Sequence, residues 1–471
     1  MTSSESGASR APATMPLRSR LAVAAGRTAA AASRALGRGS GGMIGGEVAM
    51  KVSPAVLADL AQGRRCVIVS GTNGKSTTTR MVRTALGAAG QVASNTNGDN
   101  LPSGVLTALM AHPHARMASL EVDEMHVPIV AADVRPAVFV LLNLSRDQLD
   151  RVGEIGSVEK RLRRAVTENP GSVVVANCDD PLIASAAWDA PGVVWVAAGA
   201  SWGQDSVAFP RGGQVAQGPD GWFVRHGHGA SGTEEGGATT DEGGAGVGDG
   251  DPRPAATHRR PEPHWWLEDV NLTPQGAPGP TATLRGPDGV SVPLALSLPG
   301  RVNLGNAAQA VAAAVALGID PADAARAVGT VSEVAGRYSV HDVEGRKARI
   351  MLAKNPAGWQ EAMTMLDPAV SQVVVGVNGQ VPDGTDLSWL WDVDFELLGG
   401  VPGRRIVACG ERGADLAVRL EYAGIHCDLV DLPMDALAAL EPGKVEMLLN
   451  YTSLRDFKKI LDQRQAKEDR R

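Results

Sequence analysis

Residues 66–78, which read CVIVSGTNGKSTT, carry the clearest structural signal in this chain. The apolar run Cys66–Ser70 predicts a buried strand, and the Gly-rich turn after it predicts entry into a helix over Gly74–Ala89. Glycines let backbone N–H groups approach phosphate oxygens, and the start of a helix adds partial positive charge. We therefore predict a phosphate-binding loop made of Gly71, Thr72, Asn73, Gly74, Lys75, Ser76 and Thr77.

The polar side chains of this loop fit nucleotide chemistry. Lys75 is expected to reach the β- and γ-phosphates, and Ser76 or Thr77 to supply a hydroxyl to Mg²⁺. The first glycine departs from the strict GxxxxGK[ST] spacing, so a Gly-rich turn without a ligand is the alternative. We set that alternative aside because the lysine, the hydroxyls and the strand-to-helix context occur together.

Short runs rich in Val and Ile recur after this loop, separated by segments with helical patterns. They predict an α/β fold with a doubly wound, mostly parallel sheet that helices cover on both faces. The expected strands are Met117–Val122, Ala137–Leu144, Ser172–Ala176 and Val193–Ala197. Further helices are expected over Asn303–Leu317 and Ala322–Val331.

A second alternating series begins near Lys347 and predicts a smaller, Rossmann-like domain. Its expected strands are Ala348–Leu352, Gln372–Val377, Arg405–Ala408, Cys427–Val430 and Val445–Leu449, with a helix over Ala414–Tyr422. The hinge is expected near Val334–Arg337. The predicted division is a tail and amphipathic helix over 1–45, an ATP-binding domain over 46–333 with an insertion at about 200–290, and a C-terminal domain over 334–471.

Composition narrows the classes of function. The chain has 471 residues, of which 44% are hydrophobic, and a formal net charge of −7. This charge argues against nucleic acid as the main partner. No apolar run reaches the roughly 20 residues that span a bilayer. Four cysteines without a CxxC pair favour a reducing, cytoplasmic setting. Residues 227–263, dominated by Gly, Glu, Asp, Thr and Pro, predict a disordered insertion.

Several motifs follow the phosphate-binding loop in the order known from one superfamily. Glu121 ends a predicted strand, and residues 143–150 read NLSRDQLD, 177–181 NCDDP, 300–306 GRVNLGN and 336–337 GR. Alone, Glu121 is more often a solvated strand end, and NCDDP could be an Asx-type turn. Together with TNGKSTT, the set resembles the Mur ligase and folylpolyglutamate synthase superfamily. The resemblance implies a Mg²⁺-binding role for Glu121, and nucleotide contacts from Asn177, Asn303, Asn306 and Arg337.

Three C-terminal segments narrow the resemblance to the MurT family. They are LAKNPAG at 352–358, DGTDLSWLWD at 383–392 and NYTSL at 450–454, and Gln148 is also the MurT form of its motif. The resemblance implies an ATP- and Mg²⁺-dependent amide ligase subunit acting on lipid II. It would activate the α-carboxylate of D-glutamate as an acyl phosphate, with Lys75 and Glu121 as catalytic residues. Ammonia from a GatD-type glutaminase partner would then give D-isoglutamine.

The same resemblance gives Asp386 a role in the partner, where its carboxylate would complete a Cys-His triad by orienting the histidine. The alternative from the residues alone is a helix N-cap ahead of Leu387-Ser388-Trp389. Only about 65 residues precede the loop, fewer than the ~100 of a usual domain, so a UDP-binding domain is not expected. This fits a lipid-linked substrate met at the inner face of the membrane.

The sequence departs from the MurT pattern where a four-cysteine zinc ribbon commonly stands. Phe209-Pro210-Arg211-Gly212-Gly213 and residues 221–227, GWFVRHG, replace the two cysteine pairs. His226 and His228 do not suffice for a tetrahedral site, so no zinc is predicted. Lys160 lies near the position of the carbamylated lysine of many Mur ligases, but its arginine neighbours favour a solvated helix face.

Two other functions stay open on the sequence alone. A ligase that joins an amino acid to a folate or murein precursor would turn over with a free amino acid and without ammonia. A nucleotide-binding scaffold for wall-synthesis enzymes would keep the phosphate-binding loop without catalysis. The segments LAKNPAG and DGTDLSW argue against the first, and the presence of both Glu121 and Asp386 disfavours the second.

Overall fold

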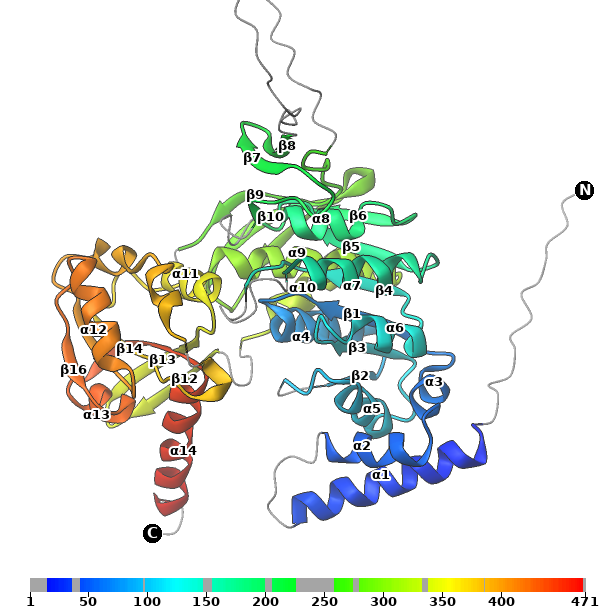
Figure 1. Ribbon diagram of the computed structural model, residues 1–471, viewed down its shortest axis with the longest axis horizontal. Coiled ribbons are helices and arrows are strands. Elements are labelled where there is room, and N and C mark those ends of the chain that lie inside the picture. The colour runs from blue at the N-terminus through cyan, green and yellow to red at the C-terminus, as the bar shows by residue number, and fades with distance from the viewer. Residues whose placement is uncertain are drawn as a thin grey trace, which may run out of the picture.

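The computed structural model describes most of the chain: residues 15–35, 43–95, 98–146, 155–199, 206–225, 258–273, 279–332, 338–384 and 386–468. Two six-stranded sheets organise it, one in each half of the chain (Figure 1). Within these ranges no helix has the length and apolar character to cross a membrane. Four predicted features lie outside them: the N-terminal tail, residues 147–150, the hinge with Arg337, and most of the Gly/Glu-rich insertion.

The first sheet is parallel throughout and has the strand order β2-β3-β1-β4-β5-β6. Its strands are β1 (Arg65–Ser70), β2 (Val92–Ser94), β3 (Met117–Glu121), β4 (Val138–Leu141), β5 (Val173–Asn177) and β6 (Val193–Val196). The α/β fold class predicted from the Val- and Ile-rich runs is confirmed. Because β1 has neighbours on both sides, the segments that leave β1, β3 and β4 meet at one edge of the sheet.

Two layers of helices bury the faces of this sheet. One core contains α3 (Val56–Ala61), α5 (Pro102–Ala111), α6 (Val127–Val134), α7 (Ile155–Thr167) and α8 (Pro181–Ala187). The other contains α4 (Lys75–Leu86), α9 (Arg301–Ala316) and α10 (Pro321–Gly329). The Ala-rich sequence of α9 explains its place, because small side chains allow a helix to be buried on nearly every side.

Helices α1 (Leu17–Ala35) and α2 (Ile44–Val52) form an outer layer beyond α5, at the lower end of the molecule in Figure 1. Glycines permit the close packing: a Cβ on Gly26 would lie 2.5 Å from the carbonyl oxygen of Gly45, and one on Gly46 would overlap Ser103. The amphipathic helix predicted within residues 1–45 corresponds to α1. The predicted boundary at residue 45 falls inside α2 and is therefore misplaced.

The second sheet has the order β12-β13-β17-β14-β15-β16. Its strands are β12 (Tyr338–Val343), β13 (Arg346–Leu352), β14 (Gln372–Gly376), β15 (Arg405–Cys409), β16 (Asp428–Val430) and β17 (Gly443–Leu449). Only β12 is antiparallel, paired with β13 through a turn at Glu344 and Gly345. Helices α11 (Pro356–Thr364) and α12 (Gly413–Tyr422) cover one face, and α13 (Pro433–Ala438) and α14 (Tyr451–Glu468) the other.

Between β6 and α9 lies an antiparallel insertion. It contains the hairpin β7 (Gln214–Gly218) and β8 (Gly221–Arg225), and the three-stranded sheet β9 (Trp266–Asn271), β10 (Thr281–Arg285) and β11 (Ser291–Ala295). The predicted disorder up to residue 263 is wrong at its end, because residues 258–263 are ordered along β8. The N–H of Val224 donates to the carbonyl of His258 at 2.8 Å, and that of Arg260 to Trp222 at 2.8 Å.

An aromatic cluster occupies the place where the MurT pattern has cysteines. Trp222 is 2% exposed, and its ring lies 5.7 Å from that of Phe209. The ring of His258 lies 4.9 Å from Phe209 and 4.8 Å from Trp188. The indole N–H of Trp222 donates to the carbonyl of Cys178 at 2.9 Å. Apolar packing thus holds the hairpin on α8; the absence of zinc stays a prediction.

Trp222→Ala should loosen this hairpin. Removing a buried indole costs roughly 3–5 kcal/mol and here leaves the Cys178 carbonyl without its donor. Limited proteolysis of this variant should show faster cleavage within residues 206–225. Trp222→Phe keeps an aromatic ring, so its cleavage rate should lie between those of the alanine variant and the wild type. Unchanged cleavage of the alanine variant would show that the cluster does not hold the hairpin.

Candidate active site

The phosphate-binding loop connects β1 to α4 at the carboxyl edge of the first sheet. Gly71 has φ +139° and Gly74 has φ +85°, both in the region that favours glycine. A Cβ on Gly71 would lie 2.9 Å from the carbonyl oxygen of Asn143, and one on Gly74 would lie 2.9 Å from Oδ1 of Asn306. The backbone therefore curves tightly between two asparagines, which leaves the N–H groups at the start of α4 open to an anion.

The loop is fixed to the segment after β4 by several hydrogen bonds. The N–H groups of Thr72 and Asn73 donate to the carbonyl and to Oδ1 of Asn143, both at 2.9 Å. The Thr72 hydroxyl donates to the carbonyl of Ser145 at 3.1 Å and accepts from its N–H at 3.0 Å. The NLSRDQLD segment that begins at Asn143 thus shapes the loop directly, although its residues 147–150 lie outside the described residues.

Lys75 lies buried inside the loop, with 7% of its surface exposed. Its Nζ donates to the carbonyls of Gly71 at 2.5 Å and Thr72 at 3.2 Å, and to Oε1 of Glu124 at 3.0 Å. These three acceptors use all three N–H bonds of the ammonium group. Burial raises the pKa of the Glu124 carboxyl, although the ammonium of Lys75 opposes this shift. Glu124 was not among the predicted site residues.

Glu124→Gln should destabilise the nucleotide-free protein, and Mg-ATP should restore part of the lost stability. Removing one charge of a buried pair costs up to roughly 3–5 kcal/mol, and a phosphate could replace the lost charge. We expect a lower Tm without nucleotide, and a larger rise in Tm with Mg-ATP than in the wild type. Glu168→Gln, at the exposed pair with Arg164, is the matched control. Equal Tm values for Glu124→Gln and wild type without nucleotide would contradict this.

Glu121 ends β3 beside β1, where it pairs in register with Val69. Asn95 holds its backbone: the Glu121 N–H donates to Oδ1 at 2.8 Å, and Nδ2 donates to the Glu121 carbonyl at 2.7 Å. The side chain is 2% exposed, and its Oε1 has no hydrogen-bond partner among the described residues. A buried carboxylate oxygen without a donor fits a bound cation, so Glu121 suits Mg²⁺.

Other hydroxyls of the same region also suit a hydrated cation or a phosphate. Ser76 is half-buried at the start of α4, and the buried hydroxyls of Thr78 and Thr79 lack partners in the described part of the chain. Across the described ranges no group of three or more His, Cys, Asp or Glu side chains could hold a metal. The donor set offered here is therefore a carboxylate and hydroxyls.

Two asparagines of α9, both predicted to contact the nucleotide, lie beside the loop. Asn303 and Asn306 are 8% and 5% exposed, and Nδ2 of Asn306 donates to Oδ1 of Asn303 at 3.3 Å. Both line a cavity that also contacts the second sheet domain. From the first half come Asn73, Gly74, Thr77, Leu298, Val302, Asn303 and Asn306, and from the second Tyr338, Met351, Leu352, Lys354, Gly358, Glu361, Ala362 and Met365. Polar and apolar lining of this kind suits a nucleotide.

The segment LAKNPAG supplies the opposite wall of this cavity. Asn355 caps α11 by accepting from the N–H of Gly358 at 2.8 Å, and it accepts from Nδ2 of Asn73 at 3.3 Å. Lys354 lines the cavity one residue earlier. A lysine and two asparagines from different domains thus meet at the phosphate-binding loop. Sequence reasoning used this segment only for resemblance and did not place Lys354 or Asn355 in the site.

Asn177 is not brought to the cavity. Its Oδ1 accepts from the N–H of Asp179 at 3.0 Å, and its Nδ2 donates to the carbonyl of Gly199 at 3.0 Å. The next acid, Asp180, caps α8 and accepts from the N–H of Leu144 at 2.9 Å. Burial raises the pKa of Asp180 to about 6 in spite of its three backbone donors. The NCDDP motif therefore ties two loops together, and the nucleotide contact predicted for Asn177 stays a prediction.

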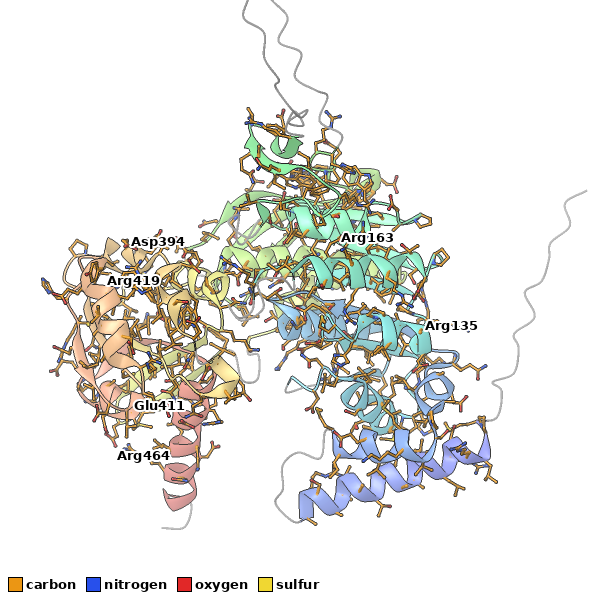
Figure 2. All side chains as sticks on the ribbon, viewed as in Figure 1. Arg135, Arg163, Asp394, Glu411, Arg419 and Arg464 are labelled. Carbon is orange, nitrogen blue, oxygen red and sulfur yellow. The ribbon has the colours of Figure 1, made fainter. Side chains whose placement is uncertain are left out.

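Lys160 lies exposed on α7, whereas its neighbour Glu159 is buried. Oε1 of Glu159 accepts from the Ser185 hydroxyl at 2.6 Å, and Arg163, labelled in Figure 2, lies 3.3 Å from its Oε2. This arrangement agrees with the solvated helix face that the arginines predict. Carbamylation of Lys160 stays untested.

The four cysteines are free thiols, and three of them are buried. Burial raises the pKa of Cys66, Cys178 and Cys409 to about 12, which keeps them as unreactive thiols. Burial also raises the pKa of the half-buried Cys427. These thiols do not suit a glutaminase nucleophile.

Asp386 lies exposed in the second domain, two residues before η6 (Ser388–Trp391). The N–H of Ser388 donates to its Oδ1 at 2.9 Å, and hydrogen bonds from Ser388 lower the pKa of the carboxyl. The side chain therefore does act as a local cap. Because the carboxylate is exposed, capping and a role in a partner are compatible.

A single arginine holds the loop that follows Asp386. Arg419 of α12 donates to the carbonyls of Leu390 at 3.2 Å and Val393 at 2.7 Å, and it pairs with Glu396 of η7 (Phe395–Gly400) at 3.1 Å. Its guanidinium also lies 5.6 Å from the ring centres of Trp391 and Phe395. Figure 2 shows Arg419 and Asp394 at the same corner of this domain.

Known protein families match both parts of the chain, the one with the phosphate-binding loop and the one with Asp386. Residues 69–201 match the Mur ligase middle domain, and residues 352–454 match the MurT ligase C-terminal family. The lipid II isoglutaminyl synthase (glutamine-hydrolyzing) subunit MurT of Streptococcus pneumoniae is 28% identical over 465 residues, covering 96% of this chain and 98% of the relative. Over nearly its whole length the chain is therefore similar to MurT subunits. The MurT subunit of Staphylococcus aureus strain N315 is 26% identical and covers 92% of this chain and 95% of the relative.

Solved structures show that the chain has a Mur ligase fold. MurF from Acinetobacter baumannii superposes with a TM-score of 0.62 at 18% identity, covering 88% of this chain and 80% of that one. MurF from Thermotoga maritima in complex with ADP gives a TM-score of 0.56 at 14% identity, covering 88% and 83%. At these identities the likeness concerns the fold. The matches to MurT subunits and to the Mur ligase middle domain support an ATP-dependent, Mur-ligase-like function, and the roles of individual residues are proposals.

Proposed function

We propose that this chain is the ATP-using subunit of a lipid II isoglutaminyl synthase. It would amidate the α-carboxylate of D-glutamate in the stem peptide, at the inner face of the membrane. The observation that carries the proposal is one cavity in which the phosphate-binding loop meets LAKNPAG, with Asn73 and Asn355 in contact at 3.3 Å. Lys354 would supply a second cation to the phosphates from the C-terminal domain.

The proposed chemistry has two steps. The substrate carboxylate attacks the γ-phosphorus of ATP, and the bond from that phosphorus to ADP breaks, which gives an acyl phosphate. Ammonia then attacks the acyl carbon, and phosphate leaves as the amide forms. Lys75 and the loop N–H groups would bind the β- and γ-phosphates, and Asn303 and Asn306 would contact the adenine. Glu121 and Ser76 would hold Mg²⁺, which neutralises phosphate charge when bound.

Ammonia would come from a GatD-type glutaminase. Within the described residues the cysteines are buried or have raised pKa values, and Asp386 is an exposed, ionised carboxylate. We propose that Asp386 reaches the partner and orients the histidine of its Cys-His pair. We also propose that the chain divides into two domains at residues 333–334. The C-terminal domain, which carries Asp386, would face the partner.

The test is ATP-dependent amidation of lipid II with ammonium or with glutamine, with and without a GatD-type subunit. We expect ammonium to support amidation by this chain alone, and glutamine to do so only with the partner. Turnover with a free amino acid instead of ammonia would point to another Mur-type ligase. Nucleotide binding without turnover under every condition would point to a scaffold.

Arg419→Gln should separate the two ammonia sources. Because Arg419 holds the segment after Asp386, its loss should displace that carboxylate, and a displacement of about 1 Å can cost 10²-fold in rate. Glutamine-driven amidation should fall while ammonium-driven amidation persists. Arg412→Gln, at an exposed pair with Asp415, is the control. An equal loss with both sources would show that Arg419 supports the whole domain rather than the Asp386 loop.

A further inference from the structure

The outer layer of α1 and α2 presents a surface that neither the nucleotide site nor the Asp386 loop uses. Small residues of α1 face inward, where Ala22, Gly26 and Ala30 are buried against α2 and its neighbours. Both helices also carry exposed residues, and they lie at the lower end of the molecule in Figure 1.

The exposed charges of these two helices are mostly positive. Helix α1 carries four arginines and no acidic residue, and α2 adds one lysine and one glutamate. All six charged side chains are exposed, so the two helices contribute five positive charges and one negative charge, a net +4, in a chain of net −7. We call this surface the basic helical face; its charged residues are Arg18, Arg20, Arg27, Arg34, Lys51 and Glu47.

The positive charges of the basic helical face are not neutralised within the chain. In the described ranges none of its five cations forms an ion pair, and the groups that do bond, Arg18 and Arg27, donate to the carbonyls of Val52 and Met110. Exposed arginines elsewhere commonly face carboxylates. Examples are Arg164 with Glu168, Arg326 with Asp323 and Arg405 with Asp428. The positive charges of the basic helical face can therefore attract an anionic partner.

Aliphatic side chains accompany these charges. Leu17 is 70% exposed and Leu21 58%, while on α2 Ile44 is 44% and Val52 37% exposed. Exposed aliphatic groups among unpaired arginines are typical of segments that lie in the headgroup region of a bilayer, where acyl chains accept the aliphatic groups and anionic lipids the cations. A nucleic acid would satisfy the charges but would leave the leucines in water.

We propose that the basic helical face docks this protein on an anionic phospholipid bilayer. Docking at this face would hold the ligase at the surface where a lipid-linked substrate is embedded. Bilayer binding does not depend on the proposed function; only the benefit to catalysis rests on it.

The test is co-sedimentation of the full chain, alone and with its glutaminase partner, with vesicles of phosphatidylglycerol or of phosphatidylcholine. We expect binding to the anionic vesicles and its loss in 1 M salt, where the screening length is about 3 Å. Arg20→Glu/Arg34→Glu should weaken binding about tenfold or more. Arg326→Glu/Arg405→Glu, with the same change in net charge on other surfaces, should bind like the wild type. Leu17→Ser/Leu21→Ser should also weaken binding.

All altered residues are exposed, and nucleotide binding checks that each variant is folded. Equal vesicle binding by the wild type and Arg20→Glu/Arg34→Glu, or no binding of the wild type, would overturn the proposal. A DNA duplex that competes fully, with no effect of the leucine changes, would assign the face to a nucleic acid. Amidation of detergent-dispersed lipid II should be unchanged by Arg20→Glu/Arg34→Glu; if the wild type fails there, the proposed function fails independently of docking.

Discussion

Glutamine-driven amidation is expected to fall by roughly 10³-fold or more in Asp386→Asn, whereas amidation with added ammonium should continue. The carboxylate is exposed, and hydrogen bonds from Ser388 lower its pKa, so it is ionised at neutral pH. An ionised carboxylate can hold a histidine in the tautomer that activates a thiol, and an amide cannot do so equally well. Asparagine keeps an oxygen that accepts from the Ser388 N–H, so the fold of the loop should survive.

The measurement compares initial rates with glutamine and with ammonium for the same complex. Asp394→Asn is the matched control, because Asp394 is an exposed carboxylate on the same loop (Figure 2). It should retain both activities. If Asp386→Asn loses both activities equally, Asp386 acts within this chain and the assignment to a partner's triad is wrong. If it loses neither, its carboxylate serves as a cap only.

The parts of the fold that sequence could predict are those with a simple period. Buried parallel strands such as β1, β14 and β15 are continuous runs of Val, Ile and Ala, because both faces of a parallel sheet are covered. By contrast, β12 has a mixed burial pattern at a sheet edge and was not predicted. This strand forms because it pairs with β13 through a turn at Glu344 and Gly345. The pattern of apolar residues does not report such a pairing.

The candidate site likewise combines residues that a single motif predicts with residues that only the fold brings together. Lys75 was predicted from the Gly-rich motif that contains it, and Asn303 and Asn306 from the resemblance; their nucleotide contacts stay predictions. Glu124 was missed, since only the fold brings it to Lys75 from 49 positions away in the sequence. Lys354 and Asn355 were missed because their place at the cavity depends on how two domains meet. The amide of Asn177 bonds within its own loop, and its predicted nucleotide contact stays a prediction.

Replacing Lys75 should abolish ATP-dependent amidation with either source of ammonia. Its ammonium is the charge held inside the phosphate-binding loop, and a transition state that spreads negative charge over phosphate oxygens depends on such a cation. We expect the rate of Lys75→Ala to fall below detection with ammonium and with glutamine. Glutamine hydrolysis by the partner should be affected far less. Lys160→Ala, at an exposed lysine of the same domain, should remain active.

Lys75→Ala alone is open to a second interpretation, because it leaves Glu124 buried without its cation. Burial already raises the pKa of Glu124, so the carboxyl can take up a proton, but some loss of stability is expected. The double variant Lys75→Met/Glu124→Gln removes both charges and should keep the fold. If it unfolds at the wild-type temperature and is still inactive, the defect is in phosphate chemistry. If it amidates lipid II, Lys75 is not the catalytic cation, and Lys354 becomes the residue to test.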